Sequence, residues 1–575
     1  MHKQISWKVG GQQGEGIEST GEIFSTALNR EGYYIYTYRH FSSRIKGGHT
    51  NNKIRMSIDP IYSISDDLDI LVAFDQETID VNYDELHENG VILADAKFNP
   101  EKPSDFKGTM YVLPFTKIAK DLGTSLMKNM VAVGATACLM QLPMPGFENL
   151  VVETFKSKGE KVVDLNKQAL ILGYEALDEV IDRNDLMSLE KPNKDERLFM
   201  IGNDAMSLGA LSSGARFMSA YPITPASEIM EFMIDKLPQL NGTVIQTEDE
   251  IAAATMAIGA NYAGVRAFTA SAGPGLSLMM ESIGLSGMTE TPLVIFNTQR
   301  GGPSTGLPTK QEQSDLNQMI YGTHGDIPKI VISPIHAEDA FYLAGEAFNL
   351  AEQYQCPVIV LSDLQLSLGK QTVHKLDQSK IKINRGQLTT EVDEETTHFK
   401  RYNVTDHGIS NRVIPGVKGG IHHVTGVEHN EYGKPSEASD NRNEQMNKRM
   451  RKLDSFELSE PFHVNIDHNE AEILVIGFIS TYGAIDEAIS RVDAKVNHIQ
   501  IRQLYPLPVD QLMRYVAKAQ KVLIVEHNYR GQLTQLVKSE TKIHDKLETL
   551  TKYDGKPFKP KEIEEKINEM LGRVK

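Results

Sequence analysis

Short apolar runs with strand-like composition alternate with helix-length segments along most of this chain, and this alternation restricts its fold more than any other feature. In residues 5 to about 180 the strand-like runs are ISWKVGG, DILVAF, GVILAD and MYVLPF. Helical patterns such as Ile17–Arg30 and Asn129–Leu142 lie among them. The rhythm predicts an α/β domain.

A second alternating region runs from about residue 197 to about residue 375. Its strand-like runs are LFMIGN, FMSAY, TVIQTE, RAFTAS, PLVIFNTQ, KIVISPI and PVIVLSDL. Because these runs are apolar almost throughout, they predict parallel strands that helices cover on both faces. A third and smaller α/β region follows, with strands expected at ILVIGF, NHIQIRQL and KVLIVEH.

Polar stretches separate these regions and set the expected domain boundaries. We expect domains at residues 1–182, 197–375 and 463–575, joined by a linker at 183–196 and by a long polar connecting segment at 376–462. The long segment is rich in Gly, His, Asn and charged residues and has no sustained period. Such a segment is typical of a disordered region or of a functional lid.

Charge and cysteine content exclude several classes of function. The chain has 60 basic and 77 acidic residues, which argues against nucleic acid or an anionic membrane as its partner. It has neither a hydrophobic export segment nor an apolar run as long as a membrane span, so we expect a cytoplasmic protein. Cys138 and Cys356 are isolated, which argues against a disulfide, a structural zinc or an iron–sulfur cluster held by this chain alone.

A glycine-rich turn lies between a strand and a helix near the N-terminus, in VGGQQGEGIESTGEIF, residues 9–24. This arrangement presents backbone N–H groups to phosphate. It fails the dinucleotide pattern because position 13 is Gln where Gly is required. Ligand binding and a tight turn without a ligand both remain open.

The loop in SAYPITPASEIMEF, residues 219–232, carries two prolines. Pro222 and Pro225 hold the preceding Tyr221 and Thr224 in extended conformation, because proline disfavours helical dihedrals in the residue before it. At the C-terminal end of a parallel strand, such a rigid loop lies where open α/β sheets bind ligands. The alternative is a stiff connection without a ligand.

Two further loops should leave the same edge of the sheet, one at the Gly-Pro-Gly turn of TASAGPGLSLMMESIGL and one in NTQRGGPSTGLPTKQEQSDL. The second loop holds Arg300 and Thr309 among small residues. The planar fork of arginine suits a carboxylate or a phosphate. An ordinary surface arginine in a salt bridge is the alternative, but three converging loops favour a binding role.

Three acidic residues, Glu248, Asp249 and Glu250, precede a helix of alanines and other small residues. Carboxylates at a helix N-terminus accept hydrogen bonds from free backbone N–H groups, which accounts for two of them. Glu250 falls inside the first turn of a helix whose residues are small enough to be buried nearly all round. It is therefore either solvated or retained for chemistry.

These motifs together resemble the fused γα subunit of 2-oxoacid:ferredoxin oxidoreductases, most closely the 2-oxoglutarate type, over essentially the whole chain. GGQQGEGIESTG and SSRIKGGHT are similar to the γ domain, and RQLYPLP and VEHNYRGQL to a transketolase C-terminal-like domain. SAYPITPASE, TEDEIAAATMAIGA, TASAGPGLSLMMES and QRGGPSTGLPTKQEQSDL are similar to the α domain. The resemblance implies three α/β domains: a γ-type domain, a parallel-sheet domain that binds the pyrimidine of thiamine diphosphate, and a transketolase C-terminal-like domain.

The resemblance also implies a cofactor site. Glu250 matches the glutamate that hydrogen-bonds N1′ of the aminopyrimidine, which leaves the capping role to Glu248 and Asp249. Tyr221, Pro222 and Ile223 match the loop that binds the cofactor.

The substrate residues follow from the same resemblance. Thr224 and Arg300 are expected to face the 2-oxoacid, with Arg300 pairing its 1-carboxylate. Thr309 is expected near the distal carboxylate of 2-oxoglutarate. Glu250, Thr224 and Arg300 are then the catalytic residues.

The family implies that thiamine diphosphate is shared with a separate β subunit, which binds its diphosphate through Mg²⁺ and carries a [4Fe–4S] cluster. This chain has no GDG…N diphosphate motif, which fits that division between the subunits. Coenzyme A is the co-substrate, ferredoxin the electron acceptor, and two subunits of each kind the expected assembly. The products expected from 2-oxoglutarate are succinyl-CoA and CO₂. The 376–462 segment, with Lys400, Arg401 and Arg412, is hypothesised to be a lid over the path by which coenzyme A enters.

Two alternatives remain. Within the same chemistry, the substrate could be pyruvate or a branched-chain 2-oxoacid. From another class, the chain could be a non-catalytic scaffold with a vestigial thiamine site, although the joint presence of Glu250, Thr224 and Arg300 argues against this.

Overall fold

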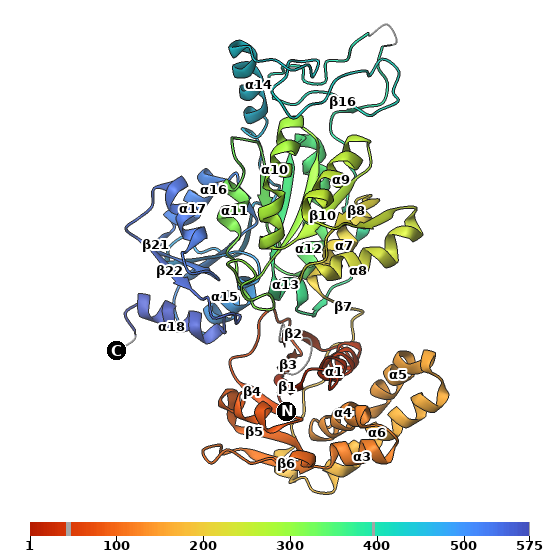
Figure 1. Cartoon of the computed structure of the whole chain (residues 1–575). Helices are drawn as coiled ribbons and strands as arrows, with labels where there is room; N and C mark the ends of the chain where they lie inside the picture. Colours follow the sequence, from red (N-terminus) through yellow and green to blue (C-terminus); the bar gives the residue numbers. More distant parts are fainter. Residues whose placement is uncertain (42–47, 394–396, 574–575) are drawn as a thin grey trace. The chain divides into compact units, whose positions relative to one another are not determined.

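The computed structural model describes residues 1–41, 48–393 and 397–573. Most of the SSRIKGGHT motif, residues 42–47, lies outside them. The chain forms two compact units. The first comprises residues 1–200, 369–375 and 558–562, and the second comprises residues 201–368, 376–557 and 563–575. Each unit is α/β, as the strand and helix rhythm predicts (Figure 1).

The first unit is built on an eight-stranded sheet with the order β6-β5-β4-β1-β3-β2-β14-β7. β1, β4, β5 and β6 are parallel, whereas β3 pairs antiparallel with both β1 and β2. The strands are β1 (Gln4–Gln12), β2 (Tyr34–His40), β3 (His49–Ser57), β4 (Leu68–Ala73), β5 (Leu86–Asp95), β6 (Thr109–Leu113), β7 (Leu198–Met200) and β14 (Gln371–Val373).

Helices cover this sheet through an aromatic core. The Trp7 ring of β1 lies 4.6 Å from the Phe24 ring, and Phe24 stacks on Phe147 at 6.1 Å. Trp7, Phe24 and Phe147 are all fully buried, so the core is anchored on the face of β1. The helices are α1 (Ile17–Glu31), α2 (Gln76–Asp80), α3 (Phe115–Asp121), α4 (Lys128–Leu139), α5 (Met144–Phe155) and α6 (Glu160–Asp178).

The second unit contains a seven-stranded sheet with the order β20-β12-β13-β11-β10-β8-β9. Every pairing is parallel except that of β20 with β12. The strands are β8 (Phe217–Ala220), β9 (Thr243–Gln246), β10 (Ala267–Ser271), β11 (Leu293–Gln299), β12 (Ile330–Ile332), β13 (Pro357–Asp363) and β20 (Gln503–Tyr505).

The strand order of this sheet reverses between β8 and β10. The chain moves from β8 outward to β9, and then returns to β10 and β11 on the other side of β8. Such a switch point opens a crevice at the carboxyl ends of the strands. The helices are α7 (Gly202–Ser212), α8 (Ser227–Lys236), α9 (Glu250–Tyr262), α10 (Gly273–Thr289), α11 (Leu316–Tyr321), α12 (Ala337–Tyr354) and α13 (Leu364–Leu368).

A smaller five-stranded sheet, with the order β17-β19-β18-β21-β22, completes the second unit. Its strands are β17 (Phe462–Ile466), β18 (Ala471–Gly477), β19 (Val496–Ile501), β21 (Ala519–Glu526) and β22 (Leu547–Thr551). The helices of this region are α15 (Thr481–Ser490), α16 (Val509–Ala517), α17 (Gln532–Thr541) and α18 (Pro560–Met570).

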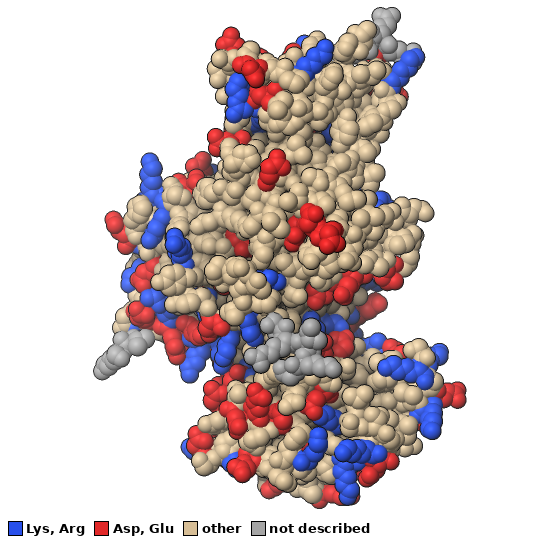
Figure 2. All heavy atoms as spheres, viewed as in Figure 1, with Lys and Arg blue, Asp and Glu red and all other residues tan. Residues whose placement is uncertain are grey.

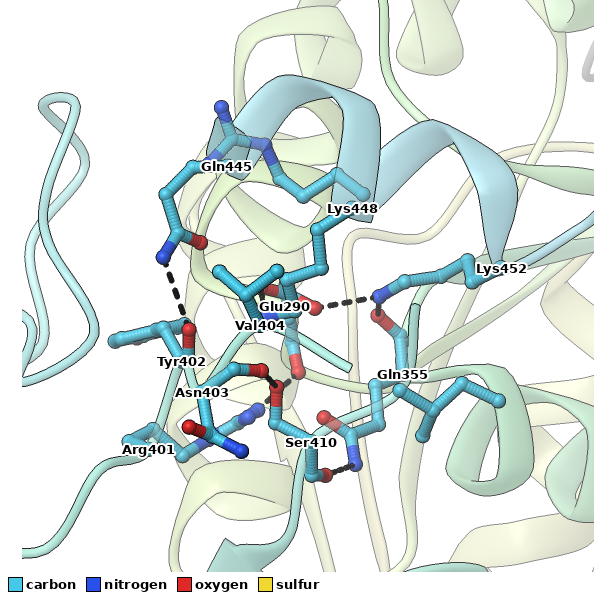
Figure 3. A network of polar contacts seen from close by, with 12 residues as sticks. Glu290, Gln355, Arg401, Tyr402, Asn403, Val404, Ser410, Gln445, Lys448 and Lys452 are labelled. Carbon is cyan, nitrogen blue, oxygen red and sulfur yellow. Dashed lines mark hydrogen bonds and ion pairs between the residues drawn. The ribbon is translucent and has the colours of Figure 1, made fainter. Parts of the chain in front are cut away.

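The polar segment between the two sheets of the second unit holds β15 (Leu388–Thr389), β16 (Arg412–Val413) and α14 (Ser439–Arg451). It packs on the seven-stranded domain through buried charges. Glu290, fully buried at the end of α10, accepts from Lys448 Nζ at 2.6 Å and from Lys452 Nζ at 2.7 Å (Figure 3). Arg401 Nη2 donates to the Glu290 carbonyl oxygen at 2.6 Å. Burial alone would raise the pKa of Glu290, but these cations lower it well below its ordinary value.

A second buried carboxylate holds the same segment. Glu352 of α12 pairs with Arg266 at 2.8 Å, with Arg385 at 2.8 Å and with Arg412 at 2.9 Å. Arg401 and Arg412, on which the lid hypothesis drew, are therefore buried and held inside the unit. Lys400 remains at the surface, where it pairs with Glu431.

One predicted strand belongs to a different sheet from the one expected. LFMIGN was expected to open the second region as a parallel strand, but β7 pairs antiparallel with β14 in the first unit. From Gly202 the chain is already the helix α7. NHIQIRQL was expected to be one strand, but it forms two: β19 belongs to the five-stranded sheet and β20 to the seven-stranded sheet. In the described ranges, no helix has the length and apolar content needed to span a membrane.

Replacing Glu290 with Gln should loosen α14, because two buried ammonium groups lose their counter-charge. Removing one partner of a buried ion pair costs about 3–5 kcal/mol, so amide hydrogen exchange in α14 should accelerate by roughly a hundredfold or more. Glu437→Gln, at an exposed position of the same segment, is the matched control. Unchanged α14 protection in Glu290→Gln would show that the ion pairs do not hold the segment.

Candidate active site

Three loops meet at the carboxyl edge of the seven-stranded sheet. They follow β8, β10 and β11, which lie next to one another in the order β11-β10-β8. Parallel pairing forces their C-terminal ends to the same edge. The YPITP, SAGPG and QRGGPSTG sequences therefore come together, as predicted for three converging loops.

The acidic run ahead of α9 divides into distinct roles. Asp249 is the N-cap, and its Oδ1 accepts from the Ala252 backbone N–H at 2.8 Å. Glu248 is exposed. Glu250, the first residue of α9, is only 6% exposed, and its carboxylate makes no hydrogen bond or ion pair within the described ranges. Capping therefore explains Asp249 but leaves Glu250 unexplained.

The surroundings of Glu250 are close-fitting and polar. A Cβ added to Gly275, in the first turn of α10, would lie 2.6 Å from Glu250 Oε1 and 2.1 Å from Ser271 Oγ. Only glycine allows this approach. Ser271 is fully buried, and its Oγ has no hydrogen-bond partner among the described residues. A buried carboxylate and a buried hydroxyl, both without partners, are the signature of a site that a ligand completes.

Arg300, directly after β11, is brought to the YPITP loop. Its Nη1 donates to the carbonyl oxygen of Thr224 at 2.7 Å. The side chain is 8% exposed, and its Nε is buried with no partner in the part of the chain that the structure describes. Burial lowers the pKa of Arg300, and Asp315 acts in the opposite direction. The structure thus joins two of the predicted substrate residues.

Arg300 lines a cavity of about 620 Å³. Thr305, Glu312 and Asp315 line it from the same part of the chain, and Tyr529 and Arg530 line it from the loop after β21. The sequence analysis predicted no site role for Tyr529 and Arg530. Residues 528–532 are far from Arg300 along the chain, and no local pattern joins the two loops.

Asp315 is the buried acid of this cavity. It accepts from Asn297 Nδ2 at 3.2 Å, and its backbone N–H donates to Gln299 Oε1 at 2.9 Å. Burial raises the pKa of Asp315 to about 6, while Asn297 and Arg300 oppose the rise. Burial also raises the pKa of Glu312. The acids of the cavity are therefore easier to protonate than ordinary surface carboxylates.

The other predicted residues belong to these loops but are not among the residues that line this cavity. Tyr221 is 39% exposed, and Pro222, Ile223 and Thr224 are partly exposed. Ser219 Oγ, at the end of β8, donates to the Ala253 carbonyl of α9 at 2.6 Å, so this loop starts beside the first turn of α9. Thr309 is 7% exposed and lies in the turn closed by the Lys310 N–H on the Leu307 carbonyl.

Comparison with known proteins places the whole chain in one family. Residues 6–176 match "Pyruvate ferredoxin/flavodoxin oxidoreductase", residues 208–448 match "Pyruvate flavodoxin/ferredoxin oxidoreductase, thiamine diP-bdg", and residues 471–563 match "Pyruvate:ferredoxin oxidoreductase core domain II". The 2-oxoacid:ferredoxin oxidoreductase subunit alpha of Saccharolobus solfataricus is 32% identical over 99% of this chain and 98% of its own length. The chain belongs to the 2-oxoacid:ferredoxin oxidoreductase alpha-subunit family.

Two further relatives refine this picture. The 2-oxoglutarate synthase subunit KorA of Methanothermobacter marburgensis is 36% identical over 66% of this chain and 99% of its own length. The solved structure of 2-oxoglutarate:ferredoxin oxidoreductase from Magnetococcus marinus, with 2-oxoglutarate, coenzyme A and succinyl-CoA bound, is 35% identical. It superposes with a TM-score of 0.92 over 99% of this chain and 100% of that one. The predicted family and the α/β fold class are confirmed.

The alpha-subunit chain offers little for metal binding in the ranges described. No group of three or more His, Cys, Asp or Glu side chains there could hold a metal ion. Both cysteines are buried, and burial raises the pKa of the Cys138 thiol to about 11 and that of Cys356 to about 12. Because metal ligation needs the thiolate, neither residue is suited to it.

Asp315→Asn should stabilise the protein at neutral pH. The unfolded carboxyl ionises near pH 4, whereas the folded one ionises near 6, so ionisation costs folding free energy as the pH rises between these values. We expect a gain of about 1–3 kcal/mol at pH 8 that disappears at pH 4, measured by thermal unfolding at both values. Asp406→Asn, at an exposed position, is the control. A gain of equal size at both pH values would contradict the buried-acid assignment.

Proposed function

We propose that the chain is the α subunit, with a fused γ domain, of a thiamine-diphosphate-dependent 2-oxoglutarate:ferredoxin oxidoreductase. Acting with a separate β subunit, it would convert 2-oxoglutarate and coenzyme A to succinyl-CoA and CO₂ and pass electrons to ferredoxin. The observation that carries the proposal is the buried Glu250, which has no partner in the part of the chain that the structure describes and lies beside the loops that hold Arg300 and Thr224. The family membership of the whole chain supports it.

The residues around Glu250 fit the aminopyrimidine end of the cofactor. When bound, thiamine diphosphate supplies the electron sink that decarboxylation of a 2-oxoacid requires. The Glu250 carboxylate would hold the proton at N1′ of the ring, which gives this buried acceptor the donor it lacks. Tyr221, Pro222 and Ile223 would border the ring from the loop after β8. A side chain at position 275 would collide with this carboxylate, so glycine there keeps the space around Glu250 open.

Arg300 would position the substrate. Its contact with the Thr224 carbonyl fixes one edge of the guanidinium and leaves Nε for a carboxylate. An anion there would also offset the burial that disfavours the charged form of Arg300. The 1-carboxylate that every 2-oxoacid carries suits this position, and Thr224 would face the same group.

The surface beside Glu250 supports a partner subunit. Ile251 and Met256 of α9 and Leu278 of α10 are 48%, 40% and 53% exposed. Figure 2 shows few charged side chains over the region that Figure 1 labels α9 and α10. An exposed apolar patch of this kind marks an interaction site. We assign it to the β subunit, which would hold the cofactor's diphosphate through Mg²⁺ and carry the [4Fe–4S] cluster, in an assembly with two subunits of each kind.

Glu250→Gln in the assembled enzyme should slow hydrogen–deuterium exchange at C2 of the bound cofactor by a factor of about 10² to 10⁴, because the amide cannot hold the N1′ proton as the carboxylate does. Exchange is followed by NMR after acid quench, and thermal unfolding checks that the fold is intact. Glu248→Gln, two residues earlier and exposed, is the matched control. Exchange at the wild-type rate in Glu250→Gln would assign cofactor activation to another residue.

The choice of substrate is tested at Thr309, for which we propose a hydroxyl contact to the distal carboxylate of 2-oxoglutarate. Losing a hydrogen bond to a charged group costs about 1.5–3 kcal/mol, so Thr309→Ala should lower kcat/KM for 2-oxoglutarate by about tenfold to a hundredfold. Pyruvate has no distal carboxylate and should be little affected. Arg300→Ala should impair both substrates.

Thr305→Ala is the matched control, because Thr305 is on the same loop and lines the cavity. Equal losses for both substrates in Thr309→Ala would mean that Thr309 only positions the loop. The assignment of 2-oxoglutarate would then lose its support at this residue, and pyruvate or a branched-chain 2-oxoacid would become the alternative. No turnover of any 2-oxoacid by the wild-type assembly would favour a scaffold with a vestigial site.

A further inference from the structure

The loop after β21 is fixed against the loop that follows Arg300. The Gln313 N–H donates to the His527 carbonyl at 2.6 Å, and the His527 N–H donates to Gln313 Oε1 at 3.0 Å. Gln532 Nε2 donates to the Ser314 carbonyl at 2.7 Å, and Gln532 Oε1 accepts from the Asn317 N–H at 2.9 Å. Two hydrogen bonds on each side of residues 529–531 leave this short stretch little freedom.

A buried carboxylate stabilises this contact between the loop after β21 and the loop after Arg300. Asp363, at the end of β13, accepts from Gln313 Nε2 at 2.7 Å and from Ser480 Oγ at 2.6 Å. Asp363 and Gln313 are both fully buried. The backbone of Arg530 is therefore positioned by a network that joins the seven-stranded and five-stranded sheets of one unit.

The backbone of Arg530 is held in place, but its guanidinium makes no contact with the described residues that would fix the side chain. The side chain is exposed, it lines the cavity that holds Arg300, and its guanidinium makes no hydrogen bond or ion pair to any residue that the structure describes. Arg300 has Asp315 in its electrostatic environment, and Glu312 lines the same cavity. Arg530 is thus a cation of the cavity that lacks a counter-charge.

We propose that Arg530 determines specificity by pairing the distal carboxylate of a 2-oxo dicarboxylic acid whose 1-carboxylate lies on Arg300. The inference rests on the proposed function and adds to it a second residue, beside the Thr309 hydroxyl, that recognises the distal carboxylate. A planar guanidinium binds a carboxylate through two parallel N–H groups, and a rigid backbone limits the entropy lost on binding. A monocarboxylic 2-oxoacid would leave Arg530 in water without a penalty, so the residue selects by attraction and not by exclusion.

The test compares 2-oxoglutarate with 2-oxovalerate, which has the same chain length and a methyl group in place of the distal carboxylate. In Arg530→Met, assembled with the β subunit and assayed at saturating coenzyme A, kcat/KM for 2-oxoglutarate should fall about tenfold. The value for 2-oxovalerate should change less than threefold. Arg530→Lys should retain part of the preference, because it keeps the charge and loses the fork. Arg514→Met, an exposed arginine of α16 outside the cavity lining, is the matched control.

Equal losses for the two substrates in Arg530→Met would overturn the inference. So would a raised KM for coenzyme A with an unchanged ratio between the substrates, because the guanidinium would then serve the co-substrate. Selective loss of 2-oxoglutarate supports it. Failure of the wild-type assembly to use any 2-oxoacid would instead refute the proposed function, so the two failures are distinguishable.

Discussion

The parallel pairing of β8, β10 and β11 is the constraint on which the candidate site depends. Parallel strands end at a common edge, so the loops after them must meet there whatever their sequences. The reversal of strand order between β8 and β10 opens a crevice at that edge. The loops are short and contain proline and glycine, so a side chain of one loop can contact the backbone of another. Arg300 in the loop after β11, for example, donates to the Thr224 carbonyl oxygen in the loop after β8.

Buried charge has two different uses in this protein. Around Glu290 and Glu352 each carboxylate is surrounded by cations, and these contacts hold a long polar segment on the domain. At the candidate site the buried groups are incomplete: among residues 1–41, 48–393 and 397–573, Glu250, Ser271 Oγ and Arg300 Nε have no hydrogen-bond partner, and Asp315 has a raised pKa. Incomplete buried polar groups reduce stability, and proteins retain them where a ligand supplies the missing contacts.

Local patterns in the sequence predicted what depends on neighbours along the chain. The apolar runs located β8, β10, β11 and β13, and the acidic run located the N-cap Asp249 and the buried Glu250. Features that depend on distant partners were not predictable. β7 and β14 are three-residue strands whose pairing has no periodic signal. The burial of Lys448 and Lys452 depends on Glu290, which is remote in sequence. The Arg530 side of the cavity depends on the equally remote pairing of Gln313 with His527.

The central claim is that this chain supplies the pyrimidine and substrate side of a 2-oxoacid oxidoreductase and needs a second subunit for activity. Its most direct test is ferredoxin reduction that depends on 2-oxoglutarate and coenzyme A, measured for the chain alone and for the chain co-expressed with its β subunit. The account predicts turnover and bound iron only in the co-expressed complex, with 2-oxoglutarate preferred to pyruvate. Turnover by the isolated chain, or a complex inactive with every 2-oxoacid, would contradict it.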